Sequence, residues 1–510
     1  MTEPTTIAGG GHAEAELGAH EGAVLARGAL AGLIGRGLGF GMQYLFLAAV
    51  GRTLGAGPAA PFYALLAGAT VLAVVGRAGL DRFGLREIAA ALANGRAAII
   101  RALTARLLVL QLLWCAVLVA VTLALRERLA GVLGLDGPAA AAWLGVLAVG
   151  IVVTFSLAEY VLAFKAVLAS ALVKQIIPYG VGSALLLFAA FNAPVLRPPH
   201  VAASLIAGMV AAVVAGAAII LRKTAGIARD PSQPLPALEV DRSIALAAVP
   251  LLMLGMTGLD IVLLQAASPG AQTSFYQAAA RTSMTLSLGL LGINAIAAPM
   301  IAAAFATGRD AELGRVVRRA SRWSLLQAAG IAVLLIVAGK TILQLFGAEF
   351  TQGYAILLVL IGAQLINAAA GPVVQLFVMT GNERVAFALL LPVVMVTVPC
   401  YYVAGKSMGG IGVAAVTALA FAAWNGGLVV LAKKRFGIWS YADNWLQAGP
   451  FVIGAAALAA LVTSGRFSAW GIAYLAAASL GLWRLCLTGE DRGLLLDAVS
   501  ARVGRRHGTR

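Results

Sequence analysis

Residues 62–96 have the sequence FYALLAGATVLAVVGRAGLDRFGLREIAAALANGR, and residues 275–309 repeat it as FYQAAARTSMTLSLGLLGINAIAAPMIAAAFATGR. A shift of 213 residues aligns the two segments without a gap, and 12 of the 35 positions are identical. Alanine-rich sequences also match by chance. Here, however, the initial Phe-Tyr, two central glycines and the final Gly-Arg all fall in one register, so an internal duplication is the favoured interpretation.

The composition around these segments predicts a membrane protein. Hydrophobic residues make up 61% of the 510 and charged residues 11%, with a mean hydropathy of +0.93. Soluble domains are roughly 45 to 50% apolar and about 25% charged. The net charge of +16 is dispersed in short runs between apolar stretches, whereas nucleic-acid binding requires a basic cluster on a solvated domain. We therefore expect no nucleic-acid partner.

Apolar windows of about 20 residues, the length needed for a helical crossing, occur fourteen times. Their limits are 28–50, 61–80, 107–125, 140–158, 171–190, 201–221, 244–266, 275–300, 323–339, 354–380, 385–404, 409–431, 446–463 and 469–487. Continuous apolar runs exclude a transmembrane β-barrel, whose segments of about ten residues alternate in polarity. The predicted class is an all-α polytopic membrane protein.

The repeat also predicts how these helices are organised. The shift carries the second window onto the eighth, six crossings later, and an even number of crossings preserves direction through the membrane. Two parallel, pseudo-twofold-related six-helix lobes around a central cavity are therefore expected. The predicted divisions are a tail (1–27), an N-lobe (28–221), a cytoplasmic linker (222–243), a C-lobe (244–435), two further helices (436–487) and a second tail (488–510).

Lysine and arginine predict the orientation, because cytoplasmic loops retain them. Of the 37, 25 fall on one side of the fourteen windows and seven on the other, which places both termini in the cytoplasm. The first 22 residues lack the basic and short apolar regions of a signal peptide, and we expect a short disordered tail there.

Several functional classes find no support in the residues. Cys115, Cys400 and Cys486 lie inside apolar windows, and the four histidines lie in tails or a loop, so we expect no metal site or other cofactor. The predicted outer loops are short and contain no closely spaced carboxylate pair, which argues against an enzyme. No G-x-x-x-x-G-K-[ST] loop is present for nucleotide binding.

Charged residues within the windows are the candidate functional residues, since each costs roughly 3 kcal/mol to place in a bilayer. Arg36 lies about 12 Å into the first window, deeper than easy snorkelling allows. Its planar guanidinium suits a diphosphate. A structural pair is the alternative for Arg36, and snorkelling to the interface is the alternative for Arg77.

Asp260 and Arg281 form the second candidate. Each lies six residues from the predicted outer end of its window, so a hairpin would place the two at the same depth. We expect an ion pair that either neutralises both charges structurally or forms a gate. Arg281 is also a candidate substrate contact, and titration of Asp260 would couple transport to H⁺ or Na⁺.

The sequence resembles a known family in several segments. LGFGMQYLFLAAVGRTLGAG and FYALLAGATVLAVVGRAGLDRFGLREIA are similar to the opening of the polysaccharide transporter family, within the multidrug/oligosaccharidyl-lipid/polysaccharide (MOP) flippase superfamily. FYQAAARTSMTLSLGL, LFGAEF and GNERVAF resemble its C-terminal half. RGLGF at residues 36–40 resembles the Arg-Val-Leu-Gly-Phe pattern of lipid II flippases, a branch that also has an arginine near the position of Arg77.

This resemblance implies a Wzx-type flippase in the bacterial inner membrane. It would translocate a polyprenyl-diphosphate-linked oligosaccharide by alternating access, with membrane lipids around it and a polysaccharide polymerase or glycosyltransferases as candidate partners. Fourteen windows depart from the twelve spans common in that family and resemble the lipid II branch instead. A lipid II flippase, a cation-coupled multidrug antiporter and a non-transporting membrane scaffold are the alternatives.

Overall fold

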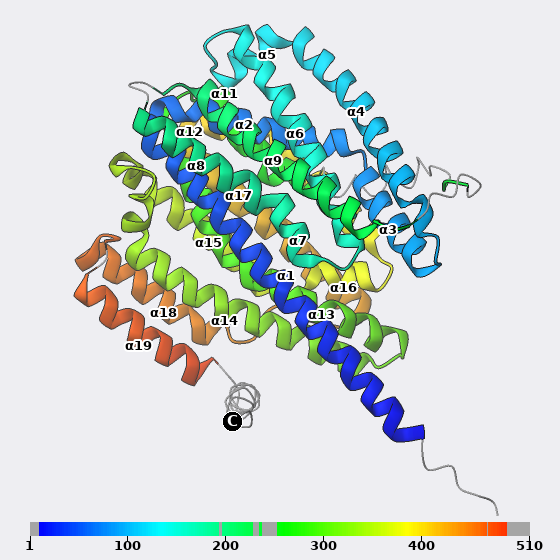
Figure 1. The fold of residues 1–510 in the computed structure, drawn as a ribbon. Helices are drawn as coiled ribbons and strands as arrows, with labels where there is room; N and C mark the ends of the chain where they lie inside the picture. Colours follow the sequence, from blue (N-terminus) through cyan, green and yellow to red (C-terminus); the bar gives the residue numbers. More distant parts are fainter. Residues whose placement is uncertain (1–9, 193–195, 228–233, 237–251, 467, 487–510) are drawn as a thin grey trace, which may run out of the picture. The chain divides into compact units, whose positions relative to one another are not determined.

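The computed structural model describes residues 10–192, 196–227, 234–236, 252–466 and 468–486. Throughout these residues the regular structure is helical, with no β-strand (Figure 1). Eleven helical segments are long and apolar enough to cross a membrane. The predicted all-α polytopic membrane class is confirmed.

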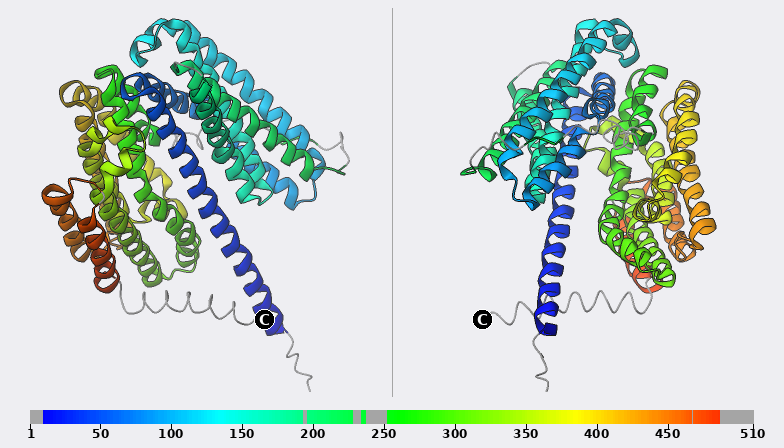
Figure 2. Two further views of the ribbon diagram at one scale, coloured as in Figure 1. Left: turned by 60° about the vertical axis from the view of Figure 1, so that its left-hand side comes forward. Right: turned by 90° about the vertical axis from the view of Figure 1, so that its right-hand side faces the viewer.

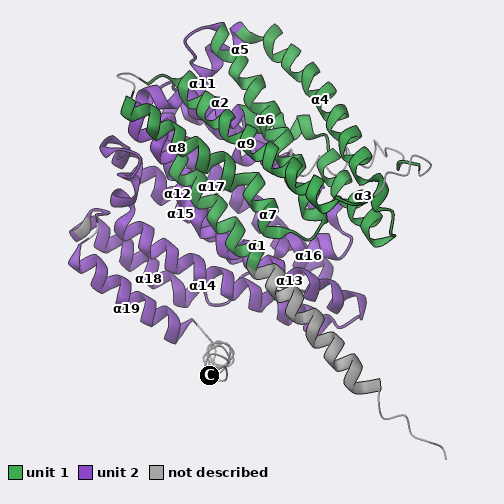
Figure 3. Cartoon of the chain, in the orientation of Figure 1, with its two compact units in different colours: residues 1–46, 69–126, 139–251 green, residues 47–68, 127–138, 252–510 purple. Residues whose placement is uncertain are grey.

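The chain forms two compact units, coloured separately in Figure 3. Unit 1 comprises residues 1–46, 69–126 and 139–251, and unit 2 comprises residues 47–68, 127–138 and 252–510. The predicted lobe limits of 28–221 and 244–435 stay a prediction.

Unit 1 is built mainly from α1 and from the helices up to α9. The helices with residues in it are α1 (Gly10–Leu54), α2 (Ala56–Arg77), α3 (Leu80–Ala93), α4 (Ile100–Ala124), α6 (Pro138–Ala163), α7 (Val167–Ala171), α8 (Ile177–Asn192) and α9 (Pro198–Lys223). A π-helical turn, η2 (Leu172–Ile176), joins α7 to α8. Its core packs α3, α4 and α6 around buried Phe83, Leu107 and Tyr160.

Unit 2 takes the end of α1 and the start of α2, and then most of the second half of the chain. Its other helices are α5 (Arg126–Leu133), α11 (Leu259–Ala267), α12 (Ala271–Ser283), α13 (Ser287–Ala306), α14 (Asp310–Leu343), α15 (Tyr354–Ala370), α16 (Val373–Met379), α17 (Glu383–Phe436), α18 (Trp445–Leu458) and α19 (Ala469–Leu485). The main core joins α13, α14, α16 and α17 around Phe377 and Trp424.

The two C-terminal helices α18 and α19 pack against α14. Leu482 of α19 and Ala448 of α18 share a buried cluster with Leu325 and Ala329 of α14. Tyr474 Oη donates to the carbonyl of Phe451 at 2.7 Å, which fixes α19 against α18. The windows predicted at 446–463 and 469–487 therefore form a helical pair attached to unit 2.

Glycines with positive φ break two of the long helices. In α17, Gly409 has φ 60° and ψ −144°, and the helix reverses there, since Thr417 Oγ1 donates to Tyr401 Oη across the turn at 3.3 Å. α17 therefore contains both windows predicted at 385–404 and 409–431. Gly371, with φ 66°, separates α15 from α16 inside the window predicted as one helix at 354–380.

The N-terminal segment differs from the expectation. α1 already begins at Gly10, so the predicted disordered tail is wrong for residues 10–22 (Figure 2). Alanine, glutamate and leucine in AEAEL favour helix, and the segment continues into the apolar part of α1 without a proline. The window predicted at 244–266 lies partly outside the described residues, and α11 forms its end.

Candidate functional site: two buried polar clusters

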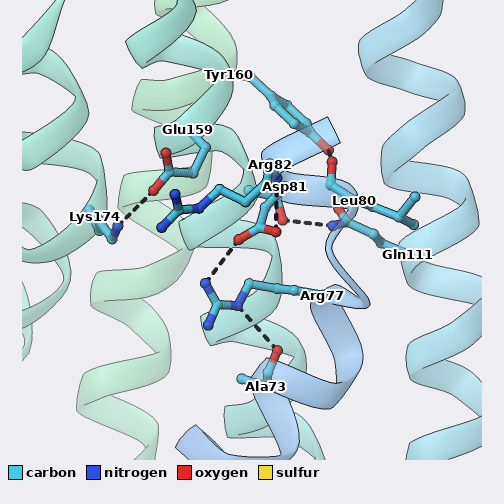
Figure 4. A network of polar contacts seen from close by, with 10 residues as sticks. Ala73, Arg77, Leu80, Asp81, Arg82, Gln111, Glu159, Tyr160 and Lys174 are labelled. Atoms are coloured by element: carbon cyan, nitrogen blue, oxygen red, sulfur yellow. Dashed lines mark hydrogen bonds and ion pairs between the residues drawn. The ribbon is translucent and has the colours of Figure 1, made fainter. Parts of the chain in front are cut away.

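Unit 1 contains a cluster of charged side chains where α2, α3, α6 and η2 meet (Figure 4). Arg77, the last residue of α2, donates from Nη1 to Asp81 Oδ2 at 2.9 Å. The side chains are 17% and 5% exposed, respectively. Ala78 and Gly79, both with positive φ, turn the chain between the two helices and so bring this pair together. Arg77 is therefore held by a local partner.

A second ion pair lies in the same cluster. Lys174 Nζ donates to Glu159 Oε1 at 2.8 Å, and the Glu159 side chain is 8% exposed. Lys174 projects from η2, and π-helical turns occur frequently at functional sites because they rotate a side chain out of the α-helical register. Neither Glu159 nor Lys174 was a sequence-predicted site residue.

The Phe155 ring connects the two pairs. The Arg77 guanidinium carbon lies 5.1 Å from the ring centroid and Lys174 Nζ lies 4.9 Å from it. A cation over an aromatic face is stabilised by about 0.5 to 2 kcal/mol, most when it is shielded from water. Arg82 also acts electrostatically on Glu159, toward which its side chain points in Figure 4. Two cations, each with a carboxylate partner, thus lie over one ring.

Neutral hydrogen bonds position the helices that carry this cluster. Gln111 of α4 donates from Nε2 to Ser156 Oγ of α6 at 2.9 Å, and Tyr160 Oη donates to the Leu80 carbonyl at 3.5 Å. Gly84 of α3 allows the Tyr160 ring to approach closely, where a β-carbon would collide with it. The cluster is built on a rigid contact of three helices.

The cations of this cluster are chemically suited to an anionic ligand such as phosphate. Arg77 and Lys174 are guanidinium and ammonium donors of the kind that bind phosphate, and each already holds a carboxylate. An arriving phosphate could accept from Arg77 or Lys174 alongside the carboxylate that each already holds. Full displacement of Asp81 or Glu159 would leave a buried carboxylate without its cation, which is costly unless that carboxylate takes up a proton.

A separate polar network lies inside unit 2. Asp260 of α11 is 4% exposed and accepts a hydrogen bond from Tyr276 Oη of α12 at 2.7 Å, and from the amide of Ile261 at 2.8 Å. Tyr276 Oη is 3.1 Å from Thr417 Oγ1 of α17, which in turn contacts Tyr401. Tyr401 Oη donates to the carbonyl of Met256 at 2.8 Å, closing a chain of hydrogen bonds across three helices.

The predicted Asp260–Arg281 ion pair stays a prediction. Within the described residues, the side-chain partner of the Asp260 carboxylate is Tyr276. Five residues separate Tyr276 from Arg281, which at about 100° per residue places them about 140° apart around α12. Depth alone therefore did not identify Tyr276, on another side of α12, as the residue that donates to Asp260.

Arg36 lies in the membrane-spanning part of α1, as predicted, and its side chain is exposed. Gly35 and Gly39 lie on the neighbouring face of α1, where they approach Ala171 and Gln175 closely. Arg36 therefore lies beside the contact of α1 with the α7–η2 segment. The structure therefore places Arg36 and Arg77 in the same unit, but shows no contact between them within the described residues.

Two features of the sequence could have indicated the residues that were missed. Glu159 is the one carboxylate of α6, in the apolar run FSLAEYVLAF, and such a group needs a cation. Lys174 was counted only as a marker of orientation, although a lysine near an apolar window can also be the partner of such a carboxylate. Among the described residues no group of three or more His, Cys, Asp or Glu side chains could hold a metal ion.

Comparison with known proteins shows which solved structures share this fold. No family model matches the chain, and no curated protein matches its sequence. Among solved structures, an inward-facing multidrug resistance MATE family transporter of the MOP superfamily matches with a TM-score of 0.58 and 15% identity, over 78% of this chain and 94% of that one. The chain has the fold of MOP superfamily transporters.

Other MOP structures match as well. The lipid II flippase MurJ, in its inward closed conformation, has a TM-score of 0.58 and 13% identity, over 90% of this chain and 97% of its own. A MOP superfamily transporter from Pyrococcus furiosus Vc1 has a TM-score of 0.53 and 15% identity, over 81% of this chain and 95% of that chain. The superfamily part of the resemblance is confirmed for the fold, and the polysaccharide transporter subfamily stays a prediction.

Proposed function

We propose that this protein is a flippase that moves a polyprenyl-diphosphate-linked oligosaccharide from the inner to the outer leaflet by alternating access. The observation that carries the proposal is the match to the lipid II flippase, which extends over 90% of the chain, whereas the MATE transporter matches over 78%. The fuller match to a lipid II flippase supports a lipid-linked cargo.

The charged residues of unit 1 support an anionic cargo. Arg77 and Lys174 lie over one phenylalanine ring, and both are donors of the kind that bind phosphate oxygens. We propose that Arg36 contacts the diphosphate first, since its side chain is exposed, and that Arg77 is the second contact. Arg281 of α12 is a further candidate contact.

Asp260 is the proposed coupling residue. It is a buried carboxylate whose side-chain partner is a neutral hydroxyl, so that the network carries a charge that protonation would remove. H⁺ is the simplest coupling ion for this geometry, and Na⁺ is the alternative. No other cofactor is proposed.

The same proposal locates the protein. A cargo of this kind is assembled at the cytoplasmic face of the bacterial inner membrane, where 25 of 37 basic residues would lie together with both termini. Membrane lipids surround the protein, and a polymerase or glycosyltransferases would supply or consume the cargo.

Complementation in bacterial strains depleted of one defined flippase tests transport and cargo together. Rescue of an O-antigen or exopolysaccharide flippase deficiency would support the proposal, whereas rescue confined to a lipid II flippase deficiency would assign the peptidoglycan precursor. Arg36→Ala should abolish rescue at an unchanged protein level. Arg484→Ala, also an exposed arginine in a helix, is the matched control and should rescue fully.

A cation-coupled multidrug antiporter is the second candidate, favoured by the match to MATE transporters and by the buried Asp260. Cells that express the chain would then resist cationic drugs in an Asp260-dependent manner. Drug resistance without rescue of any flippase deficiency would replace the flippase proposal. Failure of both assays would favour a non-transporting scaffold.

A further inference from the structure

A pocket of about 680 Å³ lies within unit 2, between α13 and the first half of α14. One wall is a basic stripe formed by Arg315, Arg318, Arg319 and Arg322. These positions have the spacing i, i+3, i+4 and i+7, so the four guanidinium groups project from one face of α14. From Arg315 to Arg322 the stripe extends about 10 Å along the helix axis.

The facing wall is apolar with the same periodicity. Ile293, Ile296, Ala297 and Met300 of α13 form this apolar stripe. Ile296 is 61% exposed and Met300 49% exposed, so the stripe has a hydrocarbon surface that unit 2 does not cover. α13 packs directly against α14 (Figure 1), and the two stripes therefore face one space.

The charges lining the pocket do not balance. Two carboxylates, Glu312 and Asp443, accompany the four arginines. Glu312 pairs with Arg309 outside the stripe at 2.7 Å, and Asp443 lies 3.6 Å from Arg322. Within the described residues, Arg315 and Arg318 pair with no carboxylate. The pocket thus retains an excess of positive charge available to an anion.

Trp323 marks the depth of this pocket. It lines the cavity directly after Arg322 and is only partly buried. Tryptophan is enriched at the boundary between headgroups and hydrocarbon, where its indole is half in each environment. Basic pockets between transmembrane helices at that depth bind anionic lipid headgroups.

We propose that this pocket binds a phosphate-bearing lipid, with the headgroup on the basic stripe of α14 and the hydrocarbon chain along the apolar stripe of α13. The length of the basic stripe suits a headgroup with more than one phosphate. Such a headgroup belongs to cardiolipin among bilayer lipids and to a polyprenyl diphosphate among lipid carriers. The site goes beyond the proposed function, because lipid binding here does not require transport.

Native mass spectrometry of the purified full chain tests this site, with one lipid added at a time. The probes are cardiolipin, phosphatidylglycerol, polyprenyl diphosphate and neutral phosphatidylcholine. Arg315→Gln with Arg318→Gln should weaken binding of the phosphate-rich lipids about tenfold or more, since each surface arginine contributes to attraction of an anionic lipid. Lys434→Gln with Arg435→Gln removes the same charge at the end of α17, outside the pocket, and should change binding less than twofold.

A second pair of variants tests the apolar stripe independently. Ile296→Ala with Met300→Ala should weaken binding of long-chain phosphatidylglycerol more than that of a short-chain form, since only the long chain reaches the stripe. Both side chains are exposed, so the variants should elute as the same monodisperse species as the parent chain.

Each result decides the proposal. Binding of cardiolipin that is lost in the arginine variant supports a bilayer lipid as the natural ligand, and binding confined to polyprenyl diphosphate supports the carrier lipid. Equal binding of phosphatidylcholine, or equal loss in the control variant, overturns the site. Failure here leaves the complementation result untouched, and failure of complementation leaves lipid binding untouched.

Discussion

Two tyrosines at equivalent positions of the internal repeat make different hydrogen bonds. Tyr63 Oη donates to the main-chain carbonyl of Leu47 at 2.8 Å, and Tyr276 Oη donates to the carboxylate of Asp260 at 2.7 Å. The shift of 213 residues relates Tyr63 to Tyr276 and also relates Leu47 to Asp260. The first repeat satisfies its buried tyrosine with a neutral carbonyl, so the fold does not require a carboxylate at this position.

In a second difference, the charged residues belong to the first repeat and the neutral ones to the second. Arg77 and Asp81 pair in the first repeat, whereas the equivalent residues in the second are Leu290 and Asn294. The helix ends nevertheless agree, since Gly95 and Gly308 both have positive φ and the amides of Arg96 and Arg309 both bond back to the fifth preceding carbonyl. The backbone of the repeat is shared, and each half carries its own buried charges.

The largest expected effect comes from making the first repeat resemble the second. Arg77→Leu leaves Asp81 buried without its cation and should destabilise the protein by about 3 kcal/mol or more. Adding Asp81→Asn restores the Leu-Asn pair of the second repeat and should recover most of that stability without restoring transport. Chemical unfolding in detergent measures the first effect and complementation the second. A double variant that is no more stable than the single one would contradict the comparison.

Asp260→Asn should reduce transport at least tenfold, about 1.4 kcal/mol, with little loss of stability. The amide keeps the shape and can still accept from Tyr276, but the charge is gone. Leu47→Ala at the equivalent position should do the reverse, costing about 2 kcal/mol or more of stability because a side chain only 1% exposed is removed. The transport rate per folded molecule, measured in vesicles, distinguishes the Asp260→Asn variant from the Leu47→Ala variant. Full transport by Asp260→Asn would exclude Asp260 from coupling.

The two tyrosines themselves provide a matched pair. Tyr63→Phe and Tyr276→Phe each remove one buried hydrogen bond and should each cost about 1 kcal/mol of stability. Only Tyr276→Phe should also alter transport, since it removes the hydroxyl that contacts Asp260 and Thr417. Equal transport by the two variants would show that the tyrosine serves packing alone.

The smallest effect tests what the repeats share. Gly95→Ala and Gly308→Ala each force a β-carbon into positive φ, in open space, and should each cost about 1 kcal/mol. The two losses should agree, because the two caps have the same hydrogen-bond pattern. A loss several times larger at one glycine would mean that the local likeness of the repeats does not extend to their energetics.

Hydropathy alone predicted the helical class and most crossings, because apolar runs such as residues 140–158 must be helical in a bilayer. It placed a boundary at Gly409, between the windows 385–404 and 409–431, but could not locate the break at Gly371 inside the apolar run 354–380. It also missed the helical start of α1, since that segment is polar and its helix follows from propensity instead.

The candidate sites were predicted less well, for a geometric reason. Sequence position fixes how deep a residue lies, but rotation about the helix axis decides which residue it meets. This is why depth did not identify Tyr276 as a partner of Asp260. The Glu159–Lys174 pair depends further on a π-helical turn, whose extra residue per turn has no signature in the composition.

The reversal of α17 at Gly409 also bears on how the protein is made. Gly412 lies against the Ala404 carbonyl and Gly405 against Val413, so almost no connecting loop separates the two halves. Because the turn is this short, neither half can be inserted far ahead of the other. We expect the two halves to enter the bilayer together as a hairpin with Lys406 near its tip.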